Sequence, residues 1–403
     1  MKIYEVGGCI RDRLLGKRPS DIDHVVVGSS IDEMIALGYK QVGKNFPVFI
    51  KNGCEYALAR KEIKTGDKHS DFEFIFTPDI TLQQDLERRD FTCNALAYDK
   101  DNDQIIDYHN GIADIKNKIL RHVNTNHFPE DPLRVLRMCR FSAQLNFDIA
   151  PETIDIASKM VDKGMLAHLS AERIWQEIYK ALETPHFDKF ILSMRACGAL
   201  KAIIPEAEQM FSTPENLKTH PEGNVGEHML LAIKSVAHCT AEVKFASFMH
   251  DIGKILTPPA QLPNHSGHEI TGIKIINEIC SRLKVPNKFK NFAKDTCLHH
   301  GNFYHILTLS AETLYEMLSS LQKYNIDKLI DVFRSDYFGR AIHKPENEQY
   351  KKEEFFKKAM KIFKSTKISE ISDIDKTTNG NDIKHQLKEH TIQKLQILKN
   401  IYS

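Results

Sequence analysis

The chain has 403 residues, of which 41% are hydrophobic and 27% charged, and its formal net charge is +1. This length predicts roughly two to four domains, and the near-neutral charge excludes a protein that binds nucleic acid over its whole surface. No run approaches the roughly 20 apolar residues of a membrane helix, and the first residues show no export signal. The eight cysteines form no CxxC pair, so we expect buried, reduced thiols and a cytoplasmic protein.

The predicted elements change in character along the chain. We expect strands over residues 3–6, 22–27, 47–50, 56–59 and 72–76, with helices over 9–15, 81–88 and 92–97. From about residue 112 onward only helical spacing remains, which predicts an α+β fold with a small mixed-sheet head followed by helices. We predict a head over 1–111, a helical neck and body over 112–215, a third domain over 216–345 and a helical tail over 346–403.

A glycine pair, Gly7-Gly8, ends the first predicted strand and opens the first helix. Glycine allows the backbone to approach a phosphate, and a helix N-terminus offers free N–H groups to it. Arg11 lies one turn further along the same helix, where it can reach the same phosphates. A simple tight turn is the other interpretation of the glycine pair.

Two carboxylates, Asp21 and Asp23, flank Ile22 at the start of an apolar strand. Because residues i and i+2 of a strand share a face, we expect both carboxylates to point one way and Ile22 to point into the core. A divalent cation relieves their repulsion, and Mg²⁺ prefers carboxylates together with substrate phosphates. Two such ions can activate a hydroxyl and stabilise a leaving pyrophosphate. A second alternating run, residues 99–103, we interpret as an acidic turn.

Together these motifs resemble a known family. Residues 6–16 (VGGCIRDRLLG), followed by the DID of residues 21–23, resemble the head signature of class II CCA-adding enzymes and bacterial poly(A) polymerases, in the polymerase β nucleotidyltransferase superfamily. The resemblance extends to about residue 340. Three further runs are similar to the family's RRDFTINALA, EDxxR and S-x-E-R-I motifs: residues 88–97 (RRDFTCNALA), 130–134 (EDPLR) and 170–174 (SAERI).

The resemblance implies template-independent addition of CCA to the 3′ end of tRNA from CTP and ATP, with Mg²⁺ held by Asp21 and Asp23. Asp131 and Arg134 would read the base, because a carboxylate accepts from the amine that cytosine and adenine share. At i, i+3 spacing they should lie on one helix face, although an ordinary surface ion pair is the alternative interpretation. The implied nucleotide-binding residues are Gly8, Arg11, Arg89, Asp131, Arg134, Arg137 and Arg140.

Histidines and aspartates form a second constellation within the helical part. His228, His250-Asp251 and Asp336 follow the H…HD…D order of HD phosphohydrolases. Imidazole and carboxylate together suit a transition metal or Mg²⁺, which activates water for attack on a phosphoester. Because the chain has 19 histidines, an unrelated set of surface histidines is the alternative. Weaker candidates, for substrate phosphate or a second metal, are His268 and His300, and fainter ones are His265 and His305.

For this constellation the resemblance implies an HD domain over 216–345, with Ni²⁺ or Mg²⁺ as its metal. It would carry 2′,3′-cyclic phosphodiesterase, 2′-nucleotidase and phosphatase activities on RNA ends. Residues 335–340 (SDYFGR) resemble the family's A-D-x-R-G-R, with Phe338 in place of an arginine. The expected partners are tRNA, CTP and ATP, without a membrane, in a monomer or homodimer. Poly(A) polymerase and a non-catalytic RNA-binding protein are the competing hypotheses.

Overall fold

The computed structural model describes residues 1–19, 21–43, 48–64, 72–342, 345–370 and 380–402. The chain divides into two compact units. The first comprises residues 1–181 and 189–203, and the second comprises residues 182–188 and 204–403. Among the described residues, no helix is both long and apolar enough to cross a membrane.

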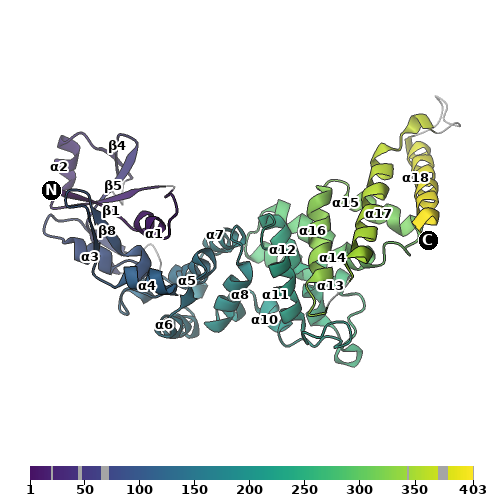
Figure 1. The fold of residues 1–403 in the computed structure, drawn as a ribbon, viewed down its shortest axis with the longest axis horizontal. Coiled ribbons are helices and arrows are strands. Elements are labelled where there is room, and N and C mark those ends of the chain that lie inside the picture. Colours follow the sequence, from purple (N-terminus) through teal and green to yellow (C-terminus); the bar gives the residue numbers. More distant parts are fainter. Residues whose placement is uncertain (20, 44–47, 65–71, 343–344, 371–379, 403) are drawn as a thin grey trace. The chain divides into compact units, whose positions relative to one another are not determined.

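A seven-stranded mixed sheet forms the N-terminal part of the first unit (Figure 1). Its strand order is β3-β4-β5-β2-β1-β8-β9. β2 and β5 are parallel, whereas the other neighbouring strands are antiparallel. The strands are β1 (Lys2–Val6), β2 (Asp23–Val27), β3 (Lys40–Val42), β4 (Val48–Lys51), β5 (Cys54–Leu58), β8 (Leu96–Asp99) and β9 (Gln104–Asp107). β6 (Lys61–Lys64) and β7 (Phe72–Ile75) pair separately.

Both faces of this sheet pack against apolar residues, because successive side chains of β2 point into two different core clusters. Val25 packs with Tyr4, Leu82 and Leu86 on one face, and Val26 packs with Met34 and other apolar residues on the opposite face. Leu82 and Leu86 lie on α3 (Leu82–Glu87), and Met34 lies on α2 (Ile31–Ala36). The structure thus confirms the predicted small mixed sheet.

The remaining helices of this part are α1 (Gly8–Leu14), α4 (Gly111–Asn117), α5 (Leu133–Leu145), α6 (Pro151–Asp162), α7 (Ala171–Leu182), α8 (Phe187–Ala196) and α9 (Ala199–Ile203). One predicted helix is wrong. Residues 92–97 form only a single 3₁₀ turn, Thr92–Asn94, before β8 begins at Leu96. A short parallel pair, β10 (Ile119–Leu120) and β11 (Asp148–Ile149), also lies where only helices were expected.

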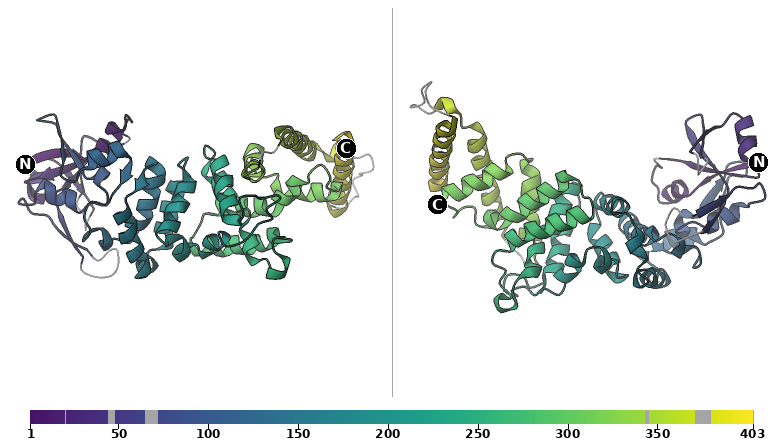
Figure 2. Two further views of the ribbon diagram at one scale, coloured as in Figure 1. Left: turned by 60° about the horizontal axis from the view of Figure 1, so that its bottom comes forward. Right: turned by 180° about the vertical axis from the view of Figure 1, so that it is seen from behind.

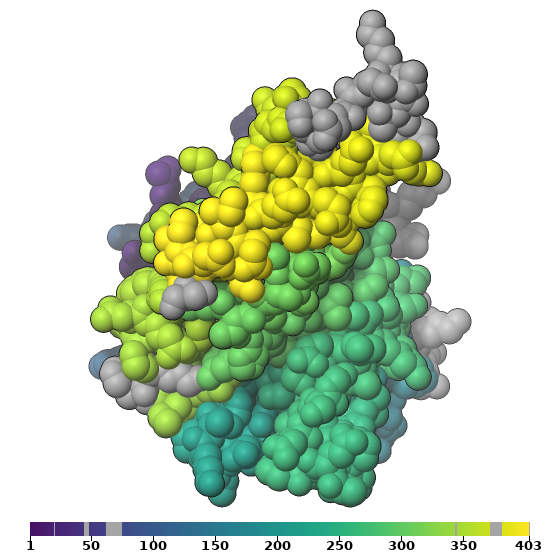
Figure 3. Space-filling model, turned by 90° about the vertical axis from the view of Figure 1, so that its right-hand side faces the viewer, coloured from purple at the N-terminus to yellow at the C-terminus, as the bar shows by residue number. Residues whose placement is uncertain are grey.

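The described part of the second unit consists of helices and loops (Figure 2). α11, α12, α14 and α16 pack against one another, with α13 against α14. α18 packs on α15 and α17, and its outer surface is visible in Figure 3. The helices are α10 (Pro205–Met210), α11 (Val225–Ser235), α12 (Ala241–Met249), α13 (His268–Arg282), α14 (Asn287–Tyr304), α15 (Ala311–Leu321), α16 (Ile326–Phe338), α17 (Glu346–Ser365) and α18 (Gly380–Tyr402). The α+β class is therefore confirmed.

The eight cysteines are all free thiols. Six are buried, which agrees with the sequence-based expectation, but Cys54 is exposed and Cys239 is half-buried. Cys9 and Cys93 are 4% and 0% exposed, as expected for core positions.

Candidate functional site

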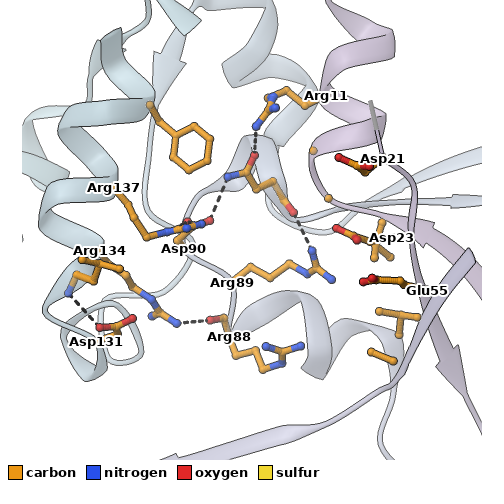
Figure 4. Close-up of a pocket in the computed structure, with 18 of the residues that line it drawn as sticks. Arg11, Asp21, Asp23, Glu55, Arg88, Arg89, Asp90, Asp131, Arg134 and Arg137 are labelled. Carbon is orange, nitrogen blue, oxygen red and sulfur yellow. Dashed lines mark hydrogen bonds and ion pairs between the residues drawn. The ribbon is translucent and has the colours of Figure 1, made fainter. Parts of the chain in front are cut away.

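Three carboxylates line one pocket around the start of β2. Asp23 pairs with Val6 of β1 on one side and with Glu55 of β5 on the other, and Asp21 lies two residues upstream. All three carboxylates line one wall of the same pocket (Figure 4). The expectation that Ile22 points into the core is wrong: its side chain is 39% exposed, because the ladder begins only at Asp23.

Glu55 was not predicted from the sequence. It lies far from Asp23 along the chain and is brought beside it by the parallel pairing of β2 and β5. The sequence around Glu55 indicates a strand, because polar and apolar residues follow one another over residues 55–57. It does not indicate which strand lies beside it.

The glycine turn forms the next part of this wall. Gly7 has φ +81°, a left-handed conformation, and a Cβ atom there would lie 2.9 Å from Arg89 Nη1. α1 begins at Gly8, and both glycines and Arg11 line the pocket. Arg11 is buried, and its Nη1 donates to Asn94 Oδ1 at 2.6 Å. The guanidinium is thereby held at the pocket edge.

Arginines of α5 form the facing wall of this pocket, whose volume is about 950 Å³ (Figure 4). Arg137 donates to Asp90 Oδ2 from Nε at 2.8 Å and from Nη2 at 2.5 Å. Asn94 Nδ2 donates to Asp90 Oδ1 at 3.1 Å, so hydrogen bonds connect Arg11 to Arg137 through Asn94 and Asp90. Burial alone would raise the pKa of Asp90, but Arg137 holds that pKa below its ordinary value.

Asp131 and Arg134 both line the pocket, but not as expected on a shared helix face. Asp131 precedes α5 in an extended conformation, where its Oδ1 accepts from the Leu133 N–H at 3.0 Å. Arg134 is buried and donates to the carbonyl oxygens of His127 and Arg88. The surface ion pair considered as an alternative is therefore wrong, and Asp131 pairs with Arg173 Nη2 at 3.4 Å.

The other predicted nucleotide-binding arginines also line this pocket. Arg89 Nη1 donates to the Asn94 carbonyl oxygen at 3.4 Å. Arg140 is buried, pairs with Glu177 and lies over the Phe141 ring. The structure thus brings together Gly8, Arg11, Asp21, Asp23, Arg89, Asp131, Arg134, Arg137 and Arg140.

The predicted histidine–aspartate constellation forms a buried cluster in the second unit. His228 of α11 directs Nε2 toward Asp251 Oδ2 at 3.5 Å and toward Asp336 Oδ1 at 3.4 Å. His250, directly after α12, places Nε2 3.2 Å from Asp251 Oδ2. All four residues are buried, so the alternative of unrelated surface histidines is wrong for them.

His268 and His300 join the cluster from α13 and α14. Their Nε2 atoms lie 3.2 and 3.3 Å from Asp251 Oδ1 and 3.0 Å from each other. The two faintest candidates do not join it. His265 Nε2 lies 3.1 Å from the Pro214 carbonyl oxygen, and His305 is exposed beyond the end of α14.

Two glycines allow α13 to approach closely enough for this arrangement. A Cβ atom at Gly253 would collide with the His268 carbonyl oxygen and lie 2.5 Å from Gly272 N. A Cβ at Gly272 would in turn lie 2.6 Å from Cys297 Sγ of α14. The segment of residues 250–253 therefore packs directly on α13, which in turn packs on α14.

Cations and carboxylates surround the cluster. Lys254 Nζ donates to Asp251 Oδ2 at 2.8 Å and to Glu215 Oε1 at 2.7 Å, and Arg340 Nη2 donates to Asp336 Oδ1 at 2.9 Å. Glu222 Oε1 lies 3.0 Å from His228 Nδ1. Burial alone would lower the pKa of His228, but the nearby carboxylates raise it to about 9. The donor set of imidazole and carboxylate fits a divalent transition metal.

Comparison with known proteins agrees with this architecture. The model of the poly(A) polymerase head domain matches residues 3–121, and a model for a probable RNA- and SrmB-binding site of polymerase A matches residues 146–211. The multifunctional CCA protein of Vibrio parahaemolyticus is 43% identical over 351 residues, covering 84% of this chain and 86% of that protein. The multifunctional CCA protein of Vibrio cholerae is 39% identical over 409 residues, covering 99% and 100% respectively.

Solved structures share the fold. The Bacillus stearothermophilus CCA-adding enzyme in complex with CTP is 21% identical, with a TM-score of 0.62 over 99% of this chain and 88% of that chain. The Thermotoga maritima CCA-adding enzyme in complex with tRNA gives the same identity and TM-score over 99% and 90%. Fold and head domain together define a nucleotidyltransferase. The full-length similarity then makes the family plain: the chain belongs to the multifunctional CCA proteins.

Proposed function

We propose that this protein adds CCA to the 3′ end of tRNA from CTP and ATP. The observation that carries the proposal is one pocket in which the carboxylates of Asp21, Asp23 and Glu55 face the arginines of α5 (Figure 4). In each step the 3′-hydroxyl oxygen bonds to the α-phosphorus of the nucleotide, the bond to pyrophosphate breaks, and the hydroxyl proton is released. The relatives named as multifunctional CCA proteins, similar over nearly the whole chain, support this reaction.

The carboxylates fit a magnesium site. Asp21, Asp23 and Glu55 offer only oxygen ligands, which Mg²⁺ prefers, and their side chains face one pocket (Figure 4). Two Mg²⁺ ions there would supply activation of the attacking hydroxyl and stabilisation of the leaving pyrophosphate. Glu55 would add a third oxygen ligand to the predicted pair of aspartates.

Selection of the base falls to Asp131 and Arg134 in this proposal. Cytosine and adenine both carry an exocyclic amine, from which the Asp131 carboxylate can accept. Uracil and guanine present a carbonyl oxygen there, which a carboxylate repels. Arg134 donates to two backbone carbonyl oxygens, which fix the position of its guanidinium group. A base site built from side chains that are fixed in this way needs no nucleic-acid template.

The experiment is nucleotide incorporation into a tRNA that lacks its CCA end. Purified protein is incubated with Mg²⁺ and one or more of labelled CTP, ATP, UTP and GTP, and the products are resolved at single-nucleotide resolution. We expect two C residues, then one A, with UTP and GTP refused. A ladder of A residues would instead assign the same pocket to a poly(A) polymerase.

We further propose that the second unit is an HD-type phosphohydrolase acting on RNA ends, as a 2′,3′-cyclic phosphodiesterase, 2′-nucleotidase and phosphatase. His228, His250, Asp251 and Asp336 would hold a divalent metal such as Ni²⁺ or Mg²⁺, which would supply activation of water. Lys254 and Arg340 fix the carboxylate oxygens of Asp251 and Asp336. Hydrolysis places the water oxygen on phosphorus and a proton on the leaving oxygen.

The test is hydrolysis of an RNA that ends in a 2′,3′-cyclic phosphate. We expect wild type with Ni²⁺ to open the ring and His250→Ala to lose this activity. His238→Ala is the matched control, because His238 is an exposed histidine outside the cluster. Equal hydrolysis by wild type and His250→Ala would contradict the assignment.

A further inference from the structure

A buried carboxylate on α3 lies behind the lining of the head pocket. Asp85 is 0% exposed, and its Oδ1 accepts from Arg88 Nη2 at 2.5 Å and from Arg88 Nε at 3.1 Å. Its Oδ2 accepts from Arg89 Nη2 at 3.4 Å, and the Arg60 N–H donates to Oδ1 at 3.3 Å. Arg88 and Arg89 both line the pocket, so one buried carboxylate holds two guanidinium groups at its wall.

The guanidinium group of Arg89 lies against the glycine turn. A Cβ atom at Gly7 would lie 2.9 Å from Arg89 Nη1, and the side chain is directed toward the wall that carries Asp23 and Glu55 (Figure 4). Arg89 Nε is buried and has no acceptor among the residues that the structure describes. A buried donor without an acceptor is costly, and the phosphate oxygens of a nucleotide are acceptors of the matching charge.

The Asp85 carboxylate has two opposite effects on phosphate binding. An arginine side chain loses rotamer freedom when it binds a phosphate, and this loss is smaller when the guanidinium group is already held in place. The negative charge of Asp85 also reduces the attraction that Arg88 and Arg89 exert on a phosphate. Burial alone would raise the pKa of Asp85, but the two arginines hold that pKa below its ordinary value, so the carboxylate is charged. The two effects predict opposite results when this charge is removed.

We propose that Asp85 is a positioning residue for nucleotide addition, which holds Arg88 and Arg89 where they bind the phosphates of the incoming nucleotide. The inference rests on the proposed CCA addition, to which it adds a residue that does not itself touch the nucleotide. The same segment also supports the base site, because the Arg88 carbonyl oxygen accepts from Arg134 Nη2 at 2.7 Å. Asp85 thus acts through its neighbours on the phosphate end of the site.

The test compares wild type with Asp85→Asn, which keeps the size of the side chain and removes its charge. Initial rates of addition to a tRNA lacking CCA are measured against CTP concentration, and inhibition by pyrophosphate is measured in parallel. We expect the KM for CTP and the inhibition constant of pyrophosphate to rise roughly tenfold, with the KM for tRNA unchanged. Asp99→Asn is the matched control, because Asp99 is 4% exposed and paired with Lys2 at 2.8 Å, but lies outside the pocket lining.

A KM for CTP that is unchanged or lower in Asp85→Asn would overturn the proposal, because loss of the negative charge alone strengthens phosphate binding. Partial unfolding does not mimic the expected result, since KM is independent of the concentration of active enzyme. No addition by wild type would overturn the proposed function together with this inference.

A second comparison introduces Asp85→Asn into a protein that already carries Arg88→Gln and Arg89→Gln. If Asp85 acts through these arginines, the KM for CTP does not rise further in this background. The exchange also removes a buried charge that the two arginine substitutions leave without its partners, so we expect it to raise the thermal stability of this protein. A further tenfold rise in the KM for CTP would show that Asp85 acts by another route and would overturn the proposal.

Discussion

At the scale of single residues, the register of one β-ladder determines where the proposed catalytic carboxylates lie. Asp23 is the first paired residue of β2, with Val6 on one side and Glu55 on the other. Asp23 therefore lies between β1, which leads into the glycine turn, and β5, which carries Glu55. The pocket places these groups together with Asp21.

Replacing Asp23 by asparagine tests the metal assignment. We expect Asp23→Asn to reduce the rate of nucleotide addition by roughly a thousandfold or more, because metal stabilisation of transition-state charge is worth several kcal/mol. Single-turnover kinetics with saturating CTP measures the change. Asp101→Asn, in the exposed turn between β8 and β9, is the matched control and should act like wild type. Equal rates for all three proteins would refute the assignment.

Replacing Asp131 by asparagine tests base selection. The amide can still accept from the Leu133 N–H, so the local turn is kept. It can also donate to the carbonyl of uracil, which the carboxylate cannot. We expect incorporation of UTP relative to CTP to rise roughly ten- to hundredfold, since one hydrogen-bonded base contact is worth about 1–3 kcal/mol. An unchanged UTP to CTP ratio would show that Asp131 does not read the base.

Sequence alternation was sufficient to predict Asp21 and Asp23, because their spacing is local. It was not sufficient for Glu55, because strand pairing between distant segments leaves no local trace. The same limit applies to Asp131: the i, i+3 spacing predicted a helix face shared with Arg134, whereas α5 begins only at Leu133, after the N-cap Pro132. Site residues close together in the sequence were therefore predictable, whereas the residues that the fold brings beside them were not.

At the scale of elements, the ion pair between Asp90 and Arg137 ties the segment before β8 to α5. The pKa of Asp90 is held below its ordinary value, so its charged form stabilises the fold above the unfolded pKa of about 3.9. This stabilisation is lost as the pH falls through the folded pKa. We expect the difference between the unfolding free energies of wild type and Asp90→Asn, measured with urea, to be largest above about pH 5 and to shrink as the pH falls below about 3.9. A gap independent of pH would count against this role.

The contact between Gly253 and α13 gives a second prediction at this scale. Gly253→Ala places a methyl group against the His268 carbonyl oxygen. We expect a loss of roughly 1–3 kcal/mol in the stability of the second unit and weaker Co²⁺ binding, with little change in CTP addition. Thermal unfolding and dialysis measure these effects. Ser281→Ala, on the exposed side of α13, is the control. If Gly253→Ala bound metal as tightly as wild type, the close approach would not be needed.

The helix predicted over residues 92–97 shows how tertiary pairing overrides local propensity. The run Thr92 to Ala97 has helical spacing, yet Ala97 and Tyr98 pair with β1 in the sheet. Residues 96–99 form hydrogen bonds to β1 and β9 in the sheet, and these bonds outweigh the small preference of leucine and alanine for a helix. The run Leu96 to Tyr98 also belongs to a hairpin with β9, through the acidic turn that the sequence did indicate.

At the scale of the whole molecule, the chain carries two chemically distinct centres in two compact units. The head pocket combines carboxylates and arginines, whereas the second unit combines imidazoles and carboxylates. The order of His228, His250, Asp251 and Asp336 was predictable as a motif. Which imidazole nitrogen faces which carboxylate oxygen was not, because the cluster is assembled from α11, α12, α13, α14 and α16.

The most direct measurement determines the 3′ sequence that the protein builds on a tRNA lacking CCA, using wild type, Asp23→Asn and His250→Ala with all four nucleotides present. We predict CCA and then termination with wild type and with His250→Ala, and no addition with Asp23→Asn. A run of A residues, or addition by Asp23→Asn at the wild-type rate, would contradict the proposal that the pocket around Asp23 carries out CCA synthesis.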